Sequence, residues 1–147
     1  MTLFPAIVRH VLIPTDGSQP SLHASQIALK WAALHKARVT FVYVVDITVA
    51  RELATASPKA APQWQEELEV TGQRALDYLT SQAAEAGLLS NKVMRRGAPY
   101  EEIADVAREQ GVGLIVIGQT NGLHRHLAGS MTERVIECAP CPVLVVK

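Results

Sequence analysis

Glycines and small polar residues follow an apolar run in the last third of the chain, within residues 113–142. The apolar residues stop at Gly118, a loop follows, and Gly129 and Ser130 then precede a pattern typical of a helix. A strand, a glycine-containing loop and a helix N-terminus in this order leave backbone N–H groups free beside the positive end of a helix dipole. Such a site favours an anion, above all phosphate. The first chemistry that the sequence predicts is therefore anion binding.

Two carboxylates stand where apolar runs end in the first third of the chain. Asp16 follows residues 11–15, and Asp46 follows residues 39–45. If the first and fourth strands are neighbours where the strand order reverses, Asp16 and the glycine loop face the crevice in which open α/β sheets bind ligands. Asp16 would then accept hydrogen bonds from a ribose or base while the loop holds phosphates. The alternative for Asp16 is an Asx turn that closes a strand–helix junction.

Short apolar runs alternate with helical patterns along the whole chain. Strands are predicted at residues 7–13, 39–45, 92–96, 114–117 and 142–146. Helices are predicted at residues 19–35, with Ser18 as N-cap, at 64–86, with Gly72 as a mild defect, at 100–110, and from Gly129 onward. Residues 47–61 are predicted to form a surface loop, with a helical turn within it as the alternative. This βαβαβαβαβ order predicts one domain, residues 1–147, with a parallel sheet and helices on both faces.

The overall composition favours a globular protein and excludes several classes. Apolar residues make up 48% and charged residues 19% of the chain, so a well-buried core is expected. The formal net charge is zero and there is no basic stripe, so we expect no nucleic-acid partner. The apolar runs are too short to span a bilayer, and the first ten residues lack a signal-peptide pattern. The expectation is a cytoplasmic protein without a membrane partner.

Six segments together resemble the universal stress protein family, and the resemblance covers nearly the whole chain. They are V-L-I-P-T-D-G-S at residues 11–18, V-Y-V-V-D at 42–46, R-G-A-P-Y-E-E-I at 96–103, L-I-V-I-G at 114–118, G-S-M-T-E-R-V from Gly129, and A-P-C-P-V-L-V-V at 139–146. Each segment is weak evidence alone, but the set is specific. The resemblance implies a Rossmann-like α/β fold, a five-stranded parallel open sheet of order 3-2-1-4-5 with helices on both faces.

The resemblance also implies a nucleotide site. ATP-binding members of that family carry a loop of the form G-x2-G-x9-G-[ST]. By resemblance, Asp16 and Val44 line the adenine and ribose end, and Gly118 matches the first glycine of the loop. The ligand implied is ATP or another adenine nucleotide such as AMP, with any Mg²⁺ bound to its phosphates. The full expected binding set is Pro14, Thr15, Asp16, Val44, Gly97, Ile117, Gly118, Asn121, Gly122, Arg125, Gly129, Ser130 and Met131.

The middle of the loop departs from the family motif. Gly129 lies eleven positions after Gly118, where the motif requires about two more. Asn121 stands where the second glycine would fall, and Gly122 comes one position later. Asparagine tolerates left-handed backbone conformations better than most residues, and Gly122 can take over the role. Nucleotide binding therefore remains the leading interpretation, and the short loop is the reason to doubt it.

Other residues with reactive side chains offer weaker alternatives. His124 and His126 could clasp a metal, but no cysteine or acidic cluster completes a ligand set. Contact between Arg125 or a neighbouring histidine and a terminal phosphate is more plausible, and a solvated loop tip is the remaining alternative. Cys138 and Cys141 form a C-x-x-C pair that follows a helix instead of opening one, which favours packing over redox chemistry.

No catalytic set is evident from the sequence. Neither Ser18 nor Ser130 lies in a G-x-S-x-G elbow, and no G-x-x-x-x-G-K-[ST] phosphate loop is present. Without a lysine at the phosphates or a base to activate water, any ATP hydrolysis is expected to be slow and incidental. We therefore expect no enzyme, and an enzyme of another α/β class is the least favoured of the three interpretations.

Two functions remain open on this sequence. The first is a stress-response sensor or regulator that binds an adenine nucleotide. The second is an interaction protein that binds no nucleotide and acts through a dimer surface and protein partners. The apolar C-terminal strand, residues 143–146, is expected at a sheet edge, where pairing with a second copy would cover it. Similar proteins dimerise in this way, so a homodimer is expected.

Overall fold

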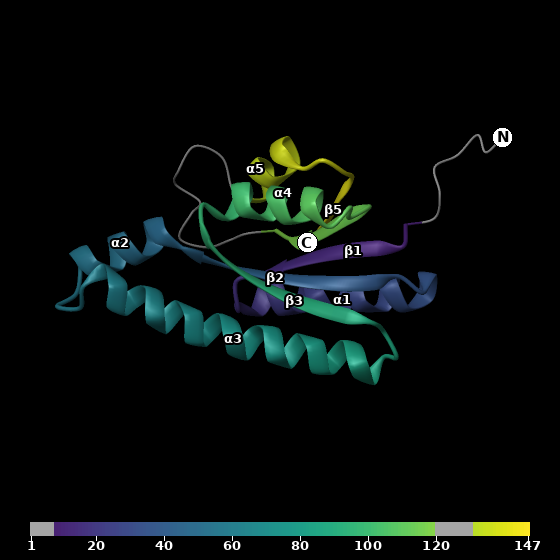
Figure 1. The fold of residues 1–147 in the computed structure, drawn as a ribbon, viewed down its shortest axis with the longest axis horizontal. Helices are drawn as coiled ribbons and strands as arrows, with labels where there is room; N and C mark the ends of the chain where they lie inside the picture. The colour runs from purple at the N-terminus through teal and green to yellow at the C-terminus, as the bar shows by residue number, and fades with distance from the viewer. Residues whose placement is uncertain (1–7, 120–130) are drawn as a thin grey trace.

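One parallel sheet with helices on both faces makes up the computed structural model, which describes residues 8–119 and 131–147 (Figure 1). The five strands are adjacent in the order β3-β2-β1-β4-β5. This order confirms the predicted fold class. The bounds of the elements are β1 (His10–Thr15), α1 (Gln19–His35), β2 (Arg38–Asp46), α2 (Ile47–Thr55), α3 (Ala61–Glu85), β3 (Ser90–Gly97), α4 (Pro99–Glu109), β4 (Leu114–Gly118), α5 (Met131–Cys138) and β5 (Val143–Val146).

The strand order reverses beside β1. On one side β1 pairs with β2, with His10 opposite Arg38, and on the other side it pairs with β4, with Val11 opposite Leu114. The chain therefore builds the sheet outward from β1 in one direction and then returns to build it in the other. In such a sheet the carboxyl ends of β1 and β4 diverge into a crevice. The structure confirms the prediction that the strand order reverses between β1 and β4.

Two apolar cores cover the two faces of the sheet. In Figure 1, α1 and α3 lie on one face, and α4 and α5 lie on the other. The first core includes Phe41 and Leu76, and the second includes Leu12 and Ile115, all of them nearly inaccessible to solvent. Every residue of β1 is buried, as expected for a central strand covered by helices on both sides. Among the described residues, no helix is long and apolar enough to cross a membrane.

The prediction of a surface loop at residues 47–61 was wrong in its first half. Residues Ile47–Thr55 form α2, and Asp46 is the N-cap of this helix. Its Oδ1 accepts hydrogen bonds from the backbone N–H groups of Thr48 (2.9 Å) and Val49 (3.2 Å). Asp46 thus ends β2, as predicted, and starts a helix in the same step because its carboxylate satisfies two N–H groups that the first turn leaves free.

Two other boundaries moved by a few residues. The first strand begins at His10, so Val8 lies before it, and Ile7 is outside the described residues. Helix α3 begins at Ala61 instead of Trp64, with Pro62 in its first turn, where a missing N–H costs nothing. The predicted N-cap of α1 is confirmed, because the Ser18 side chain accepts a hydrogen bond from Ser21 N.

Candidate functional site

A cavity of about 470 Å³ opens where β1, β2 and β4 end. Its walls come from these strand ends, the first turns of α1 and α4, α2, α3 and the start of α5. Seven of the sequence-predicted binding residues line it, namely Pro14, Thr15, Asp16, Val44, Ile117, Gly118 and Met131. The structure thus brings together residues more than a hundred positions apart in the chain, at the crevice predicted from the strand order.

The remaining six predicted residues are placed differently. Gly97 is not among the lining residues of this cavity. Its φ of 145° and the Glu102 Oε1 atom, 3.0 Å from where a Cβ would lie, account for a glycine at the turn into α4. The other predicted residues lie outside the described part of the chain, namely Asn121, Gly122, Arg125, Gly129 and Ser130.

The turn after β1 holds the Asp16 carboxylate at the cavity. Asp16 Oδ1 accepts a hydrogen bond from Ser18 N at 2.8 Å, which is the Asx turn considered as the alternative for this residue. Thr15 Oγ1 accepts from Gly17 N at 3.1 Å and lies 2.6 Å from Ser21 Oγ, which tightens the same turn. Because a carboxylate has two oxygens, the turn occupies one and leaves the other for a ligand. The two interpretations of Asp16 are therefore compatible.

The end of β2 adds a second carboxylate and a phenol. Burial, together with the smaller effect of the negative charges of Asp16 and Asp46, raises the pKa of Tyr43 to about 12. This effect places both carboxylates within electrostatic reach of the Tyr43 hydroxyl. All three residues line the cavity. The phenol therefore stays protonated at neutral pH and keeps its O–H as a hydrogen-bond donor.

Gly118 lines the cavity and also serves the packing of α1. A Cβ added there would lie 3.1 Å from the Ala24 Cβ and 3.1 Å from the Pro20 carbonyl oxygen. On the other side of the residue, the Gly118 carbonyl accepts a hydrogen bond from Thr132 Oγ1 at 3.1 Å. The glycine allows α1 to approach β4 closely, and the hydrogen bond ties α5 to the same point. A side chain at this position would separate the walls of the cavity.

Charge and shape together limit what this cavity can hold. Among its described lining residues only Asp16 and Asp46 carry a charge, and both are acidic. The rest of the described wall is largely apolar, with Val49, Leu68 and Ile103 among the larger side chains. This combination suits a flat apolar ring with hydroxyl or amino groups that donate to carboxylates. It does not suit an anion beside these two carboxylates.

Sequence reasoning missed several lining residues. Val49 lies on α2, in a segment that was predicted as a loop. Leu68 lies on α3, the helix that follows α2 in the chain. The signal was present: Asp46 is an N-cap residue, and apolar residues follow it at helical spacing. Tyr43 was not among the predicted binding residues, and it follows Val42 and precedes Val44 on a strand whose successive side chains point to opposite faces.

The C-x-x-C pair lies away from this cavity and shows no activation. Cys138 is exposed at the end of α5, and Cys141 is half-buried before β5. Burial raises the pKa of the Cys141 thiol, which lowers its reactivity. Among the described residues, no group of three or more histidine, cysteine and acidic side chains is placed to hold a metal ion. His124 and His126 lie outside the described residues.

Solved structures of similar shape include two with nucleotides. A universal stress protein in complex with cAMP has a TM-score of 0.73 at 23% identity and covers 96% of this chain and 98% of its own. The universal stress protein from Archaeoglobus fulgidus in complex with dAMP has a TM-score of 0.69 at 21% identity and covers 97% of this chain and 100% of its own. At these identities the likeness shows the fold.

Sequence comparison goes further than the fold. The profile of the universal stress protein family matches residues 8–147. Universal stress protein MJ0531 from Methanocaldococcus jannaschii is 40% identical over 146 residues, which cover 96% of this chain and 83% of the relative. The structure of universal stress protein UspA from Lactobacillus plantarum is 30% identical, with a TM-score of 0.72 and coverage of 97% and 100%. With fold, profile and relatives in agreement along its length, this chain is a member of the universal stress protein family.

Proposed function

We propose that this protein binds an adenine nucleotide in the cavity at the ends of β1, β2 and β4, and acts in the cytoplasm as a stress-response sensor or regulator without a catalytic role. The observation that carries the proposal is the cavity itself, with two carboxylates beside apolar walls at the switch point of the sheet. This is where doubly wound sheets bind nucleotides.

The charge distribution supports one orientation of the nucleotide. The nucleoside end lies against Asp16 and the apolar walls, because ribose hydroxyls and an exocyclic amine are donors that carboxylates accept. The phosphates point away from both carboxylates, toward the loop that follows Gly118. The resemblance assigns Gly129 and Ser130 to those phosphates, on sequence alone. The cAMP and dAMP complexes of similarly folded proteins support a ligand of this class.

Titration with a graded set of ligands tests the proposal. Adenosine, AMP and ATP, with and without Mg²⁺, are titrated calorimetrically into protein purified without nucleotide. Small molecules released on denaturation are identified by mass spectrometry. We expect adenosine to bind and each phosphate to add affinity. No released nucleotide and no heat at millimolar ATP would sink the proposal.

Two substitutions separate the nucleoside end from the phosphate end. Asp16→Asn keeps an oxygen for the Ser18 turn but removes the charge, so affinity should fall about tenfold for adenosine and ATP alike. Gly129→Val should weaken ATP and leave adenosine unchanged. Arg74→Gln, on the exposed surface of α3, is the control. Loss of ATP binding with Asp16→Asn alone would place the phosphates elsewhere than the glycine loop.

The rival function is an interaction protein that binds no nucleotide. The observation in its favour is the loop between Gly118 and Gly129, which is two positions shorter than the motif of ATP-binding members. The same titration decides between the two functions. If no adenine ligand binds while the protein remains folded and dimeric, the rival takes its place.

We also propose that the protein is a homodimer through β5. This strand lies at one edge of the sheet, and Leu144 on it is 41% exposed. The carbonyl group of Pro142 accepts a hydrogen bond from β4, and that of Val146 accepts one from Gln119 N, directly after β4. The alternate residues, Val143 and Val145, therefore direct their backbone groups outward. An open apolar edge of this kind pairs readily with a second strand.

Blocking the outward edge tests the dimer. Val145→Pro removes an outward N–H group and keeps the hydrogen bonds to β4, so we expect a folded monomer. Light scattering at micromolar concentration measures the mass, and circular dichroism checks the fold. A natural protein that is already monomeric at this concentration would refute the homodimer.

A further inference from the structure

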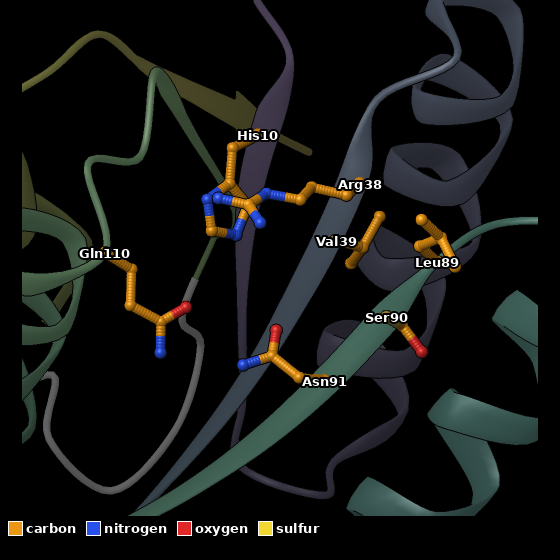
Figure 2. Close-up of a pocket in the computed structure, with 7 residues that line it drawn as sticks. All are labelled: His10, Arg38, Val39, Leu89, Ser90, Asn91 and Gln110. Atoms are coloured by element: carbon orange, nitrogen blue, oxygen red, sulfur yellow. The ribbon is translucent and has the colours of Figure 1, made fainter.

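A second cavity lies at the amino ends of the strands, whereas the proposed nucleotide site lies at their carboxyl ends. It measures about 380 Å³ and is formed where β1, β2 and β3 begin and α4 ends. Figure 2 shows the side chains of His10, Gln110 and Asn91 arranged around it, with the Arg38 side chain extending toward His10. All four of these side chains are polar, although the amino ends of strands in this fold are not where the nucleotide is expected.

A buried hydroxyl connects three of these side chains. Thr40, which is fully buried, has its Oγ1 at 2.7 Å from His10 Nε2, at 2.5 Å from Asn91 Oδ1 and at 2.8 Å from Gln110 Oε1. These contacts join residues from β1, β2, β3 and the end of α4. They hold the two amides in fixed positions beside the cavity, so the cavity wall is organised before any ligand arrives.

The proton of Thr40 determines what the amides present to the cavity. A hydroxyl has one proton, so it can donate to the oxygen of Asn91 or of Gln110 but not to both. As placed, both amide oxygens lie within hydrogen-bond distance of Thr40 Oγ1. Because one proton serves only one of them, we assign the other amide with its N–H group donating to Thr40 and its carbonyl oxygen toward the cavity that the same side chain lines. The wall thus offers a hydrogen-bond acceptor held in place by a buried network.

Among the described residues that line this cavity, Arg38 carries the only charge. Its side chain is exposed, and none of the ion pairs formed within residues 8–119 and 131–147 involves it. It also lies close enough to His10 to lower the pKa of the imidazole, an effect that follows the larger one of burial. His10 is therefore neutral near pH 7, and the guanidinium is a free partner for an anion. Planar carboxylates match its paired N–H groups best.

We propose that this cavity binds a small carboxylic acid that carries a hydrogen-bond donor beside the carboxylate, that is, an α-amino or α-hydroxy acid. The carboxylate lies on Arg38, and the amino or hydroxyl group donates to the outward amide oxygen of Asn91 or Gln110. Leu89 lines the cavity and is 80% exposed, so a short apolar side chain on the ligand would cover it. The volume is at the small end of the range for ligand sites.

Leucine and three close analogues test each part of the proposal. The first analogue is the hydroxy acid of leucine. The second is isocaproate, which lacks the hydrogen-bond donor, and the third is leucinamide, which lacks the carboxylate. Binding is followed by the backbone amide NMR signals of Arg38, Leu89, Asn91 and Gln110. We expect saturable shifts at these residues with leucine or its hydroxy acid, and affinities at least about tenfold weaker for isocaproate and leucinamide.

Matched substitutions locate the site. Arg38→Gln should weaken leucine binding at least about tenfold, whereas Arg74→Gln, which removes an exposed arginine from α3, should not change it. The ATP affinity of both variants should equal that of the natural chain, because the two cavities lie at opposite ends of the strands. This separates the present proposal from the proposed function, since either can fail while the other holds.

Three results would overturn the proposal. One is the absence of saturable shifts at this cavity with every probe at millimolar concentration. Another is equal affinity for leucine, isocaproate and inorganic phosphate, which would mean that Arg38 attracts any anion. The third is unchanged leucine affinity in Arg38→Gln.

Discussion

Gly72, in the middle of α3, is the residue at which local helix preference and packing make opposite predictions. A Cβ added at this position would lie 2.3 Å from Tyr43 Cδ1, 2.5 Å from Cε1 and 2.7 Å from Cγ. Carbon atoms in favourable contact are about 3.5–4.0 Å apart, so the overlap exceeds about 1 Å for two ring atoms. Tyr43 is only 4% exposed and lies in the first core, so the ring has little room to move.

The magnitude follows from two opposing terms. Replacing glycine by alanine inside a helix gains about 0.8–1.0 kcal/mol of helix propensity. Overpacking a core costs about 1–3 kcal/mol. Because the overlap is with an aromatic ring anchored in a strand, we take the upper part of this range. We expect Gly72→Ala to lower the free energy of unfolding by about 1–2 kcal/mol, which is about 2–4 °C in Tm for each kcal/mol.

Denaturant and thermal unfolding of four proteins measure this directly. They are the natural chain, Gly72→Ala, Tyr43→Val, and the double variant. In the Tyr43→Val background the overlap is gone, so Gly72→Ala should become neutral or stabilising, with a coupling energy above about 1 kcal/mol. Arg74→Ala, on the exposed side of α3, should change stability by less than about 0.5 kcal/mol. A Gly72→Ala variant about 1 kcal/mol more stable than the natural chain would refute the packing argument.

Three further outcomes can be measured separately. Asp46→Ala should lower the free energy of chemical unfolding by about 1 kcal/mol, because two N–H groups at the start of α2 lose their acceptor. Asp46→Asn should lower it much less, and equal effects of the two substitutions would contradict the role of Asp46 as N-cap. Because the pKa of His10 is lowered in the folded protein, the imidazole of the unfolded chain takes up a proton first as the pH falls. The stability contributed by neutral His10 is therefore complete above about pH 6.5 and is lost at lower pH. His10→Gln should flatten this part of the curve of stability against pH. Iodoacetamide at neutral pH, followed by peptide mass spectrometry, should modify Cys138 well before Cys141, whose thiol pKa is raised by burial; equal rates would contradict this.

The architecture could be predicted because strands and helices alternate along the chain. Between Val39 and Val45, β2 consists of apolar or β-branched residues and one tyrosine, as expected of a strand covered on both faces, and a helix separates each strand from the next. Alternation of this kind leaves few topologies, and the carboxyl ends of the strands then meet at one edge. Pro14, Asp16, Val44 and Gly118 were placed at the cavity by that reasoning and by family resemblance together.

What could not be predicted depends on contacts between distant residues. Gly72 was interpreted as a weakness of its helix, because nothing in the local sequence points to the Tyr43 ring beneath it. The network around Thr40 joins four elements, and its residues look unremarkable in isolation. Helix α2 is a different case, because the cap residue Asp46 and the helical spacing after it are visible in the sequence and were overlooked. Its nine residues have one buried side chain, so the cap and packing on α3 stabilise it.

Both ends of the segment between β4 and α5 are tied to the sheet. Gln119 N donates to Val146 O at 2.9 Å, and Thr132 Oγ1 donates to Gly118 O at 3.1 Å. With its ends held, lengthening the segment by two residues costs only the extra entropy of closing a slightly longer loop, about 0.1–0.2 kcal/mol. The stability of the fold therefore sets almost no limit on this length. The spacing between Gly118 and Gly129 is therefore not a requirement of the fold.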